Sequence, residues 1–231
     1  MGTALIARGH RPEAIANLPL TQPSAVRAVH ASYPEADAIT ACTFGLSFTQ
    51  TNASRVAAAA LDLARRAAGS RVVVASLGPG PRLVEASRAL AAADVLLLET
   101  FRSLTALEEA LALVSHRRIW ATLSFAEGRT TDGWSPREAA ERLAGRVEAV
   151  GANCGDGLAA TTEAALAMVG AGVPVLGRPS AGVQTSARPE AFAAAARRMW
   201  SAGVTYVGGC CGIGPAHVRA AARTRRMRGE R

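Results

Sequence analysis

The sequence predicts an α/β protein with a parallel sheet that is covered by helices. Short apolar runs alternate with alanine-rich helical segments along all 231 residues. Runs such as Val72–Val74 and Val95–Leu98 are wholly apolar, which is typical of parallel strands buried on both faces. No shift in composition marks a linker. We therefore expect one domain over residues 1–231, ending in a basic tail from about residue 219.

Seven strand–helix units are expected, and they favour a TIM-type (β/α)8 barrel that lacks its first strand. A closed barrel of this type has eight strands, whereas the first predicted element is a helix at Pro23–Tyr33 with no strand before it. A doubly wound open sheet is the alternative, but no Gly-x-Gly-x-x-Gly motif follows the first strand. The predicted strands are Ala38–Cys42, Arg71–Leu77, Asp94–Glu99, Arg118–Ser124, Ala149–Cys154, Val173–Arg178 and Tyr206–Cys210.

Two helix starts carry the capping-box pattern, in which a hydroxyl residue precedes a glutamate by three positions. Ser135 with Glu138 is one, followed directly by a proline at the first helical position, and Thr105 with Glu108 is the other. The last helix is expected from Ala216 to about residue 223.

The cationic residues exclude some kinds of catalysis and argue against a nucleic-acid partner. The formal net charge is +8, and every cationic side chain is an arginine. The absence of lysine excludes Schiff-base and pyridoxal chemistry and the lysine of a phosphate-binding loop. From Arg219 onward the chain carries six arginines and one glutamate, with no aromatic residues among them on which bases could stack. We expect no nucleic-acid partner.

The chain also shows no membrane or export signal. No apolar run reaches about 18 residues, and no charged segment precedes an apolar run at the N-terminus. Four cysteines are too few for a disulfide scaffold of this length. We expect a protein of the reducing cytoplasm with no membrane partner.

Three of the four cysteines and one glutamate lie at the ends of predicted strands. Cys154 ends Gly-Ala-Asn-Cys, Cys210 and Cys211 lie in Gly-Gly-Cys-Cys-Gly, and Glu99 ends Val-Leu-Leu-Leu-Glu. Barrel enzymes carry their active sites at these strand ends. Three thiolates leave one tetrahedral position of zinc open, as in catalytic zinc sites. A disulfide between the adjacent cysteines is the alternative, although it would be strained, and Cys42 is predicted to be a small buried apolar residue.

These motifs resemble the homocysteine S-methyltransferase family over nearly the whole chain. The two cysteine motifs are highly specific for the family. The other motifs are weak individually, but together they support the resemblance because they occur in the family's order. In family order they are Met1–Thr3, Thr43–Gly45, Ser76–Pro79, Leu96–Thr100, Ser124–Phe125, Ser135–Pro136, Gly151–Cys154 and Gly208–Gly212, then Pro215 and His217.

The resemblance implies a zinc (Zn²⁺) barrel that transfers a methyl group to the thiol of homocysteine and forms methionine. It implies that homocysteine and a small methyl donor are the partners. It implies that Glu99 is the catalytic carboxylate that holds the substrate amino group, and that Asn153 lies at the turn next to a metal ligand. The implied zinc ligands are Cys154, Cys210 and Cys211, and the implied substrate-binding residues are Glu99, Gly2, Thr3 and Asn153.

The chain departs from the family pattern on the donor side and in the amino-acid pocket. The first strand with its Asp-Gly is absent, the connection after Gly78-Pro79 is short, and Cys42 and Ser180 stand where asparagine is usual. The donor therefore stays open among a sulfonium, betaine and a cobalamin protein. A truncated, non-catalytic zinc-binding barrel and a methyltransferase for another thiol are the alternatives. Because a missing strand exposes two sheet edges, we expect poor solubility or a homo-oligomer.

Overall fold

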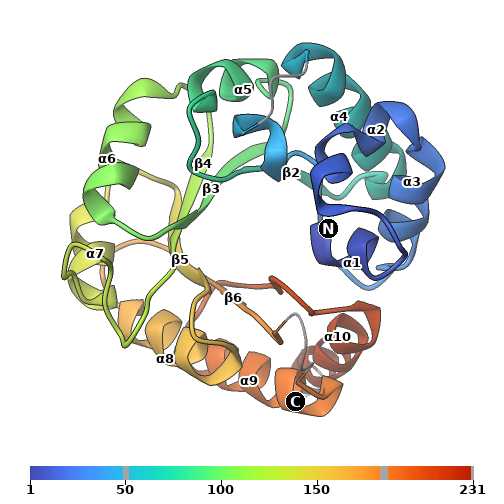
Figure 1. Ribbon diagram of the computed structural model, residues 1–231. Helices are drawn as coiled ribbons and strands as arrows, with labels where there is room; N and C mark the ends of the chain where they lie inside the picture. Colours follow the sequence, from blue (N-terminus) through green and yellow to red (C-terminus); the bar gives the residue numbers. More distant parts are fainter. Residues whose placement is uncertain (49–51, 183–186, 230–231) are drawn as a thin grey trace. The chain divides into compact units, whose positions relative to one another are not determined.

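The computed structural model describes residues 1–48, 52–182 and 187–229, without the side chains of residues 226–229. In this part of the chain seven strands alternate with helices (Figure 1). The alternation confirms the predicted fold class, a barrel-type α/β protein without a strand before the first strand–helix unit. The strands are β1 (Ala38–Thr40), β2 (Val72–Leu77), β3 (Val95–Phe101), β4 (Ile119–Leu123), β5 (Ala149–Cys154), β6 (Val175–Pro179) and β7 (Tyr206–Val207).

Helices precede β1 and follow every strand. Two short 3₁₀ helices, η1 (Pro12–Asn17) and η2 (Phe44–Ser47), lie on either side of β1 in the chain. The α-helices are α1 (Gly2–Ile6), α2 (Leu18–Thr21), α3 (Pro23–Ala31), α4 (Ala53–Ala68), α5 (Leu83–Ala89), α6 (Leu104–Leu113), α7 (Pro136–Leu143), α8 (Leu158–Met168), α9 (Pro189–Ala202) and α10 (Pro215–Gly229).

The chain forms two compact units, and the first comprises residues 1–99 and 106–120. Its strands β1, β2 and β3 pair in parallel and in chain order, with Ile39 opposite Val73 and Val74 opposite Val95. Helix α4 packs against β1 and β2, and Ala64 of this helix joins Ile39 and Val73 in an apolar cluster. This packing buries apolar side chains between α4 and the strands.

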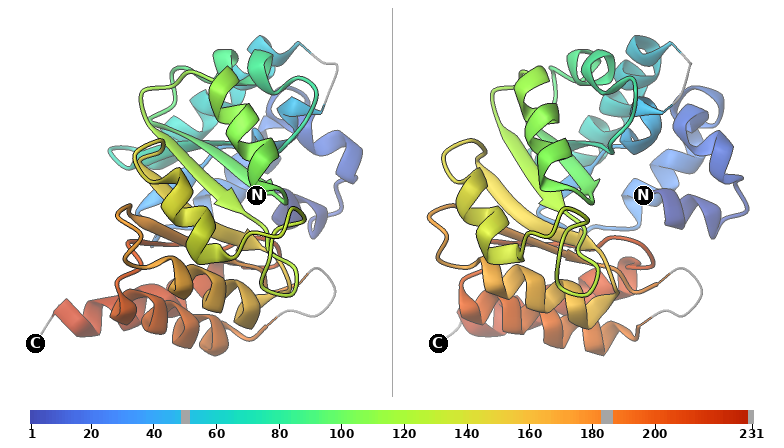
Figure 2. Two further views of the ribbon diagram at one scale, coloured as in Figure 1. Left: turned by 90° about the vertical axis from the view of Figure 1, so that its left-hand side faces the viewer. Right: turned by 60° about the vertical axis from the view of Figure 1, so that its left-hand side comes forward.

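The second unit comprises residues 100–105 and 121–231. Its strands β5, β6 and β7 also pair in parallel and in chain order, with Asn153 opposite Arg178 and Gly177 opposite Val207. Helix α8 packs on β5 and β6, and α9 lies between α8 and α10 (Figure 2). The expected single domain over residues 1–231 stays a prediction.

The helical segments before β1 bury the cysteine that was predicted to be structural. Cys42 is 4% exposed and lies in an apolar cluster with Leu5, Leu18 and Val26. Its thiol donates to the Ile15 carbonyl at 3.6 Å. Burial raises the pKa of Cys42 to about 11. The prediction that Cys42 is a small buried residue is confirmed.

The helix starts follow the sequence pattern in one case and depart from it in the other. The Ser135–Glu138 capping box is present, with each side chain bonded to the other residue's backbone. The Thr105 prediction was wrong, because α6 begins one residue earlier and the Thr105 hydroxyl donates to Asp132 at 3.0 Å. Asp132 is 27 residues away in the chain, so a local pattern cannot reveal this cap.

The end of the chain differs from the predicted boundaries. Strand β7 stops at Val207 rather than at Cys210, and α10 runs to Gly229 rather than to about residue 223. The last two residues of the predicted basic tail, 230 and 231, lie outside the described residues. In the described ranges no helix has the length and apolar character needed to cross a membrane.

The Asp132 carboxylate caps the first turn of α6, and its contribution to stability can be tested. It accepts from the backbone N–H groups of Leu104 at 3.0 Å and Thr105 at 2.9 Å. Asp132→Ala should lower the free energy of unfolding by about 1–2 kcal/mol, the usual cost of losing a helix cap. Thermal and denaturant melts measure the change. Asp62→Ala, which removes an exposed ion pair with Arg66, should cost only a few tenths of a kcal/mol as the control.

The same carboxylate predicts how this stability depends on pH. Desolvation raises the pKa of Asp132, but the hydrogen bonds from Thr105 and Leu104 outweigh it and hold the pKa below its ordinary value. A carboxyl whose pKa is lowered on folding stabilises the protein above its unfolded pKa of about 3.9 and loses this contribution as the pH falls further. The difference between wild type and Asp132→Ala should therefore shrink in acid. A constant difference would contradict the assignment.

Candidate metal centre

The three strand-end cysteines of the second unit come together in space. The Sγ atoms of Cys154, Cys210 and Cys211 lie within 4.8 Å of one another, and those of the adjacent pair are 4.0 Å apart. All three thiols are free, so the structure shows no vicinal disulfide. Zn–S bonds of about 2.3 Å in a tetrahedron place sulfur atoms about 3.8 Å apart. The cluster therefore fits a metal ion of this kind after small side-chain shifts.

The end of β6 places the adjacent cysteines opposite the third. On one side, Cys154 of β5 pairs in register with Pro179. On the other side, the Cys210 N–H donates to the Pro179 carbonyl at 3.0 Å, and the Ala181 N–H donates to the Cys211 carbonyl at 2.8 Å. The main chain of β6 thus holds both cysteine motifs by backbone hydrogen bonds.

Glycine is required where the cysteine doublet turns back toward its helix. Gly212 has φ +75°, and a Cβ atom there would lie 2.1 Å from the Gly182 carbonyl oxygen. A Cβ on Gly209 would lie 2.2 Å from a methyl group of Ile213. Any other side chain at these positions would force the backbone apart. The glycines of Gly-Gly-Cys-Cys-Gly therefore allow the close approach that places both thiols.

The backbone at Cys154 is also unusual. Its φ is +60°, a left-handed conformation that few non-glycine residues adopt. The Thr161 hydroxyl donates to the Cys154 carbonyl at 2.6 Å, and the Ser124 hydroxyl accepts from the next N–H, that of Gly155, at 3.0 Å. These two bonds hold the turn that directs the Cys154 side chain, and strained conformations of this kind are concentrated at functional sites.

The electrostatics of the trio concentrate negative charge on one sulfur. The pKa of Cys210 is held below the ordinary thiol value by its hydrogen bonds with the Cys154 and Cys211 thiols and by the nearby Arg178 and Asn153 side chains. The pKa of Cys154 is raised because its thiol donates to Cys210. The Arg178 side chain runs along Gly208, where a Cβ would lie 3.6 Å from Arg178 Cγ. These neighbours favour the thiolate form at Cys210, and the thiolate is the form that binds metal ions.

Asn153 precedes Cys154, and both ends of its side-chain amide make hydrogen bonds. It is fully buried. Its Oδ1 accepts from the Thr100 N–H at 2.9 Å and from the Thr122 hydroxyl at 2.8 Å. Its Nδ2 donates to the Thr100 hydroxyl at 2.8 Å and to Cys210 Sγ at 3.8 Å.

The remaining predicted site residues lie in the first unit. Glu99 lies within β3, which runs on to Phe101 rather than ending at Glu99 as predicted. It is 6% exposed, and a peptide bond joins it to Thr100 of the second unit. Gly2 and Thr3 are half-buried and form the first turn of α1. Their roles toward a substrate stay predictions.

His217 of the family motif has a structural role in the part of the chain described. It is 7% exposed, its Nε2 lies 2.6 Å from the Ala187 carbonyl oxygen, and its Nδ1 accepts from the Gly214 N–H at 3.1 Å. Because an imidazole that accepts at Nδ1 must donate from Nε2, the ring is neutral in this arrangement. It holds the start of α10 in place.

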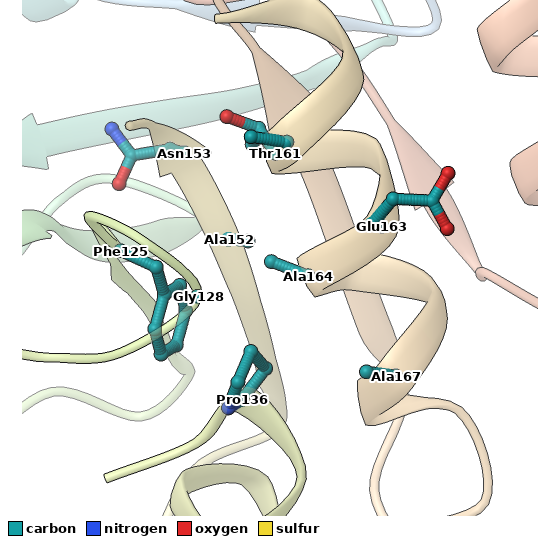
Figure 3. Close-up of a pocket in the computed structure, with 10 residues that line it drawn as sticks. Phe125, Gly128, Pro136, Ala152, Asn153, Thr161, Glu163, Ala164 and Ala167 are labelled. Atoms are coloured by element: carbon teal, nitrogen blue, oxygen red, sulfur yellow. The ribbon is translucent and has the colours of Figure 1, made fainter. Parts of the chain in front are cut away.

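A pocket of about 340 Å³ lies between α8 and the loop that follows β4 (Figure 3). Ala152 points toward α8, whereas Asn153, the next residue, points away from it, and Glu163 points away from the other lining groups. Glu163 pairs with Arg198 on the surface. The pocket wall is made largely of alanine, glycine and proline, and none of the three cysteines lines it. The pocket therefore offers no thiol that could bind a metal ion.

Three polar residues of the site were not identified from the sequence. Thr100 and Thr122 bond to Asn153, and Arg178 lies beside Cys210. Each occupies or adjoins the end of a predicted strand, which was the available signal. The two threonines lie 31 or more residues from Asn153 along the chain, so sequence spacing alone does not reveal these contacts.

Fold and site together define a barrel-type α/β protein with a cluster of three free thiols that could hold a metal ion. The family model of homocysteine S-methyltransferase matches residues 1–225. The chain belongs to the homocysteine S-methyltransferase family and is an enzyme of that class, which confirms the resemblance seen in its motifs.

Solved structures of one homocysteine methyltransferase, MmuM from Escherichia coli, resemble the chain over almost its whole length. The apo form is 26% identical with a TM-score of 0.76, and it aligns with 97% of this chain and 93% of that chain. The metallated form is 25% identical with a TM-score of 0.76 and the same coverage. A methyltransferase from Methanosarcina mazei, 14% identical over 76% of this chain and 64% of that chain with a TM-score of 0.51, shares the fold alone. A search of curated proteins finds no match.

Proposed function

We propose that the protein transfers a methyl group from a small donor to the thiol of homocysteine with the help of zinc, forming methionine. The observation that carries the proposal is the convergence of three free thiols within 4.8 Å at the ends of β5 and β7. Structural zinc sites fill all four positions with protein ligands, whereas catalytic sites leave one open. The described residues offer no fourth histidine, cysteine or carboxylate ligand in this cluster.

The donor set fits zinc rather than a hard cation. Cysteine thiolates suit zinc, whereas magnesium and calcium prefer oxygen ligands. Zinc bound to the three sulfurs would supply a position at which a substrate thiol is deprotonated at neutral pH, since a coordinated thiol loses its proton outright. A free thiol, with a pKa of about 8.5, is mostly protonated there. The metallated form of the MmuM structure supports the presence of a metal ion.

The chain's own residues would bind and orient the amino acid. Cys154, Cys210 and Cys211 would hold the metal. Glu99, buried on β3, is proposed to pair with the substrate ammonium group, and Gly2 and Thr3 remain proposed substrate contacts. In the reaction the homocysteine sulfur forms a bond to the methyl carbon as the bond between that carbon and the donor's leaving atom breaks.

Several expectations from the sequence stay open under this proposal. The donor class, a cobalamin partner and a homo-oligomer are not fixed by the described residues. The non-catalytic zinc-binding protein and the enzyme for another thiol are outcomes that the experiments below distinguish. A panel of methyl donors assayed with homocysteine separates the donor classes, and the same panel assayed with other thiols tests the alternative acceptor.

Zinc content is the first prediction of the proposal. Purified, reduced protein should carry about one zinc per chain, because three thiolates and one open position define one site. Cys210→Ser and Cys211→Ser should each lose most of the metal. Cys42→Ala, which removes a buried thiol outside the cluster, should retain it as the control. Elemental analysis that finds no zinc in folded wild-type protein would contradict the metal assignment.

The second prediction concerns the carboxylate of Glu99 on β3. Glu99→Gln should raise KM for homocysteine at least tenfold and leave zinc content unchanged, because an amide cannot form a charge-assisted bond to an ammonium group. Glu163→Gln removes an exposed carboxylate that pairs with Arg198 and should leave KM unchanged. If Glu99→Gln lost zinc in proportion to activity, Glu99 would belong to the metal site or to the fold.

A further inference from the structure

We infer that Asn153 is a positioning residue that holds the Cys210 sulfur and the backbone at Thr100 in one hydrogen-bonded unit, without touching the substrate. All four partners of its amide, on Thr100, Thr122 and Cys210, belong to the second unit. The inference rests on the proposed function, since it assigns Asn153 to the alignment of the metal ligands and of the residue that follows Glu99.

The hydrogen-bonding capacity of the Asn153 amide is already in use. An asparagine side chain offers two acceptor sites on its oxygen and two N–H donors. Thr100 and Thr122 occupy the oxygen, and Thr100 and Cys210 occupy the nitrogen. The side chain is fully buried. A substrate contact would require one of these bonds to break, so direct binding is disfavoured.

Thr100 needs a partner of this kind because its backbone is strained. Its φ is +67°, and a β-branched residue in this region is a steric outlier that persists only when its surroundings hold it. Asn153 contacts it at two points, through the backbone N–H at 2.9 Å and through the hydroxyl at 2.8 Å. The Thr122 hydroxyl fixes the rotation of the amide by donating to its oxygen. The side chain thus acts as a clamp on one residue's conformation.

The conformation of Thr100 determines how Glu99 is directed. The two residues share a peptide bond, and rotation about the Thr100 N–Cα bond changes the direction of that peptide relative to the rest of the chain. If the clamp were lost, Thr100 would relax toward negative φ and the Glu99 peptide would turn with it. The binding of the substrate ammonium group would weaken, although Glu99 itself remained.

The contact with Cys210 is the second function of the same amide. An N–H group aimed at the sulfur at 3.8 Å stabilises the thiolate and fixes its direction. Groups that orient a metal ligand in this way typically change metal affinity or activity by about 10–100-fold when they are mutated. Loss of Asn153 should therefore weaken two measurable properties, homocysteine binding and zinc affinity, through two separate contacts.

A glycine at position 100 separates these two contacts. Glycine adopts positive φ at no steric cost, so Thr100→Gly removes the need for the clamp, but combined with Asn153→Ala it does not restore the N–H donor to the Cys210 sulfur. We would compare wild type, Asn153→Ala, Thr100→Gly and the double variant. For each protein, KM and kcat are measured with saturating zinc, and zinc affinity is measured by competition with a chelator in the absence of substrate.

The expected pattern is specific to a positioning role. Asn153→Ala should raise KM for homocysteine and weaken zinc binding, each by about tenfold or more. In the double variant KM should return to within about threefold of wild type, because the glycine again allows positive φ, while zinc binding stays as weak as in Asn153→Ala. If Asn153 instead contacted the substrate, the glycine would not restore KM.

A milder pair of variants keeps the test decisive if Asn153→Ala does not fold. Thr122→Val removes only the hydroxyl that orients the Asn153 amide, and it should raise KM and weaken zinc binding in the same direction by a smaller factor. Thr162→Val, its matched control, removes an equally buried hydroxyl that donates to the Leu158 carbonyl on α8. The control should leave KM and zinc affinity unchanged.

Two results would overturn the inference. One is unaltered KM and zinc affinity in Asn153→Ala or, where that variant is unfolded, in Thr122→Val. The other is a double variant whose KM stays as high as that of Asn153→Ala. Failure of the proposed function would look different, because wild-type protein would then bind no zinc or transfer no methyl group to homocysteine.

Discussion

The backbone hydrogen bonds at the end of β6 are the constraint on which the metal centre depends. Pro179 pairs in register with Cys154 on one side and accepts the Cys210 N–H on the other, so both thiol motifs take their position from one strand end. Because the two motifs flank β6, their backbones are two strand spacings apart, about 9–10 Å, and their side chains turn toward each other across the end of β6 to bring the Sγ atoms within 4.8 Å. The absence of a side chain at Gly212 allows the close approach to Ala181 and Gly182, and its absence at Gly209 leaves room for Ile213.

This compact arrangement is obtained with strained backbone at two positions, one near the end of β3 and one at the end of β5. Cys154 and Thr100 both have positive φ, and buried hydrogen bonds hold each of them, from Thr161 in one case and Asn153 in the other. Such strain is tolerated where the surroundings determine the conformation from several sides. Here the surroundings include hydroxyl and amide groups near the carboxyl ends of the strands, such as Thr122 on β4 and Asn153 on β5.

Local patterns predicted the fold class and the convergence of the cysteines, but not the contacts that shape the site. Apolar strands and glycine-flanked cysteines are signals carried by neighbouring residues, so seven strands and the grouping of Cys154 with Cys210 could be read from the sequence. The cap that Asp132 provides to Thr105 joins residues 27 positions apart and displaced the predicted capping box. The left-handed Thr100 runs against the propensity of a β-branched residue, so only its tertiary partners account for it.

The central claim is that Cys154, Cys210 and Cys211 hold one zinc ion whose fourth position accepts the substrate sulfur. X-ray absorption at the zinc edge, recorded on the loaded protein with and without homocysteine, tests it most directly because it counts the sulfur atoms around the metal. The account predicts three sulfur ligands at about 2.3 Å and one lighter ligand in the protein alone, and four sulfur ligands after homocysteine is added. An unchanged count of three with homocysteine bound, or ligation mainly by nitrogen and oxygen, would contradict it.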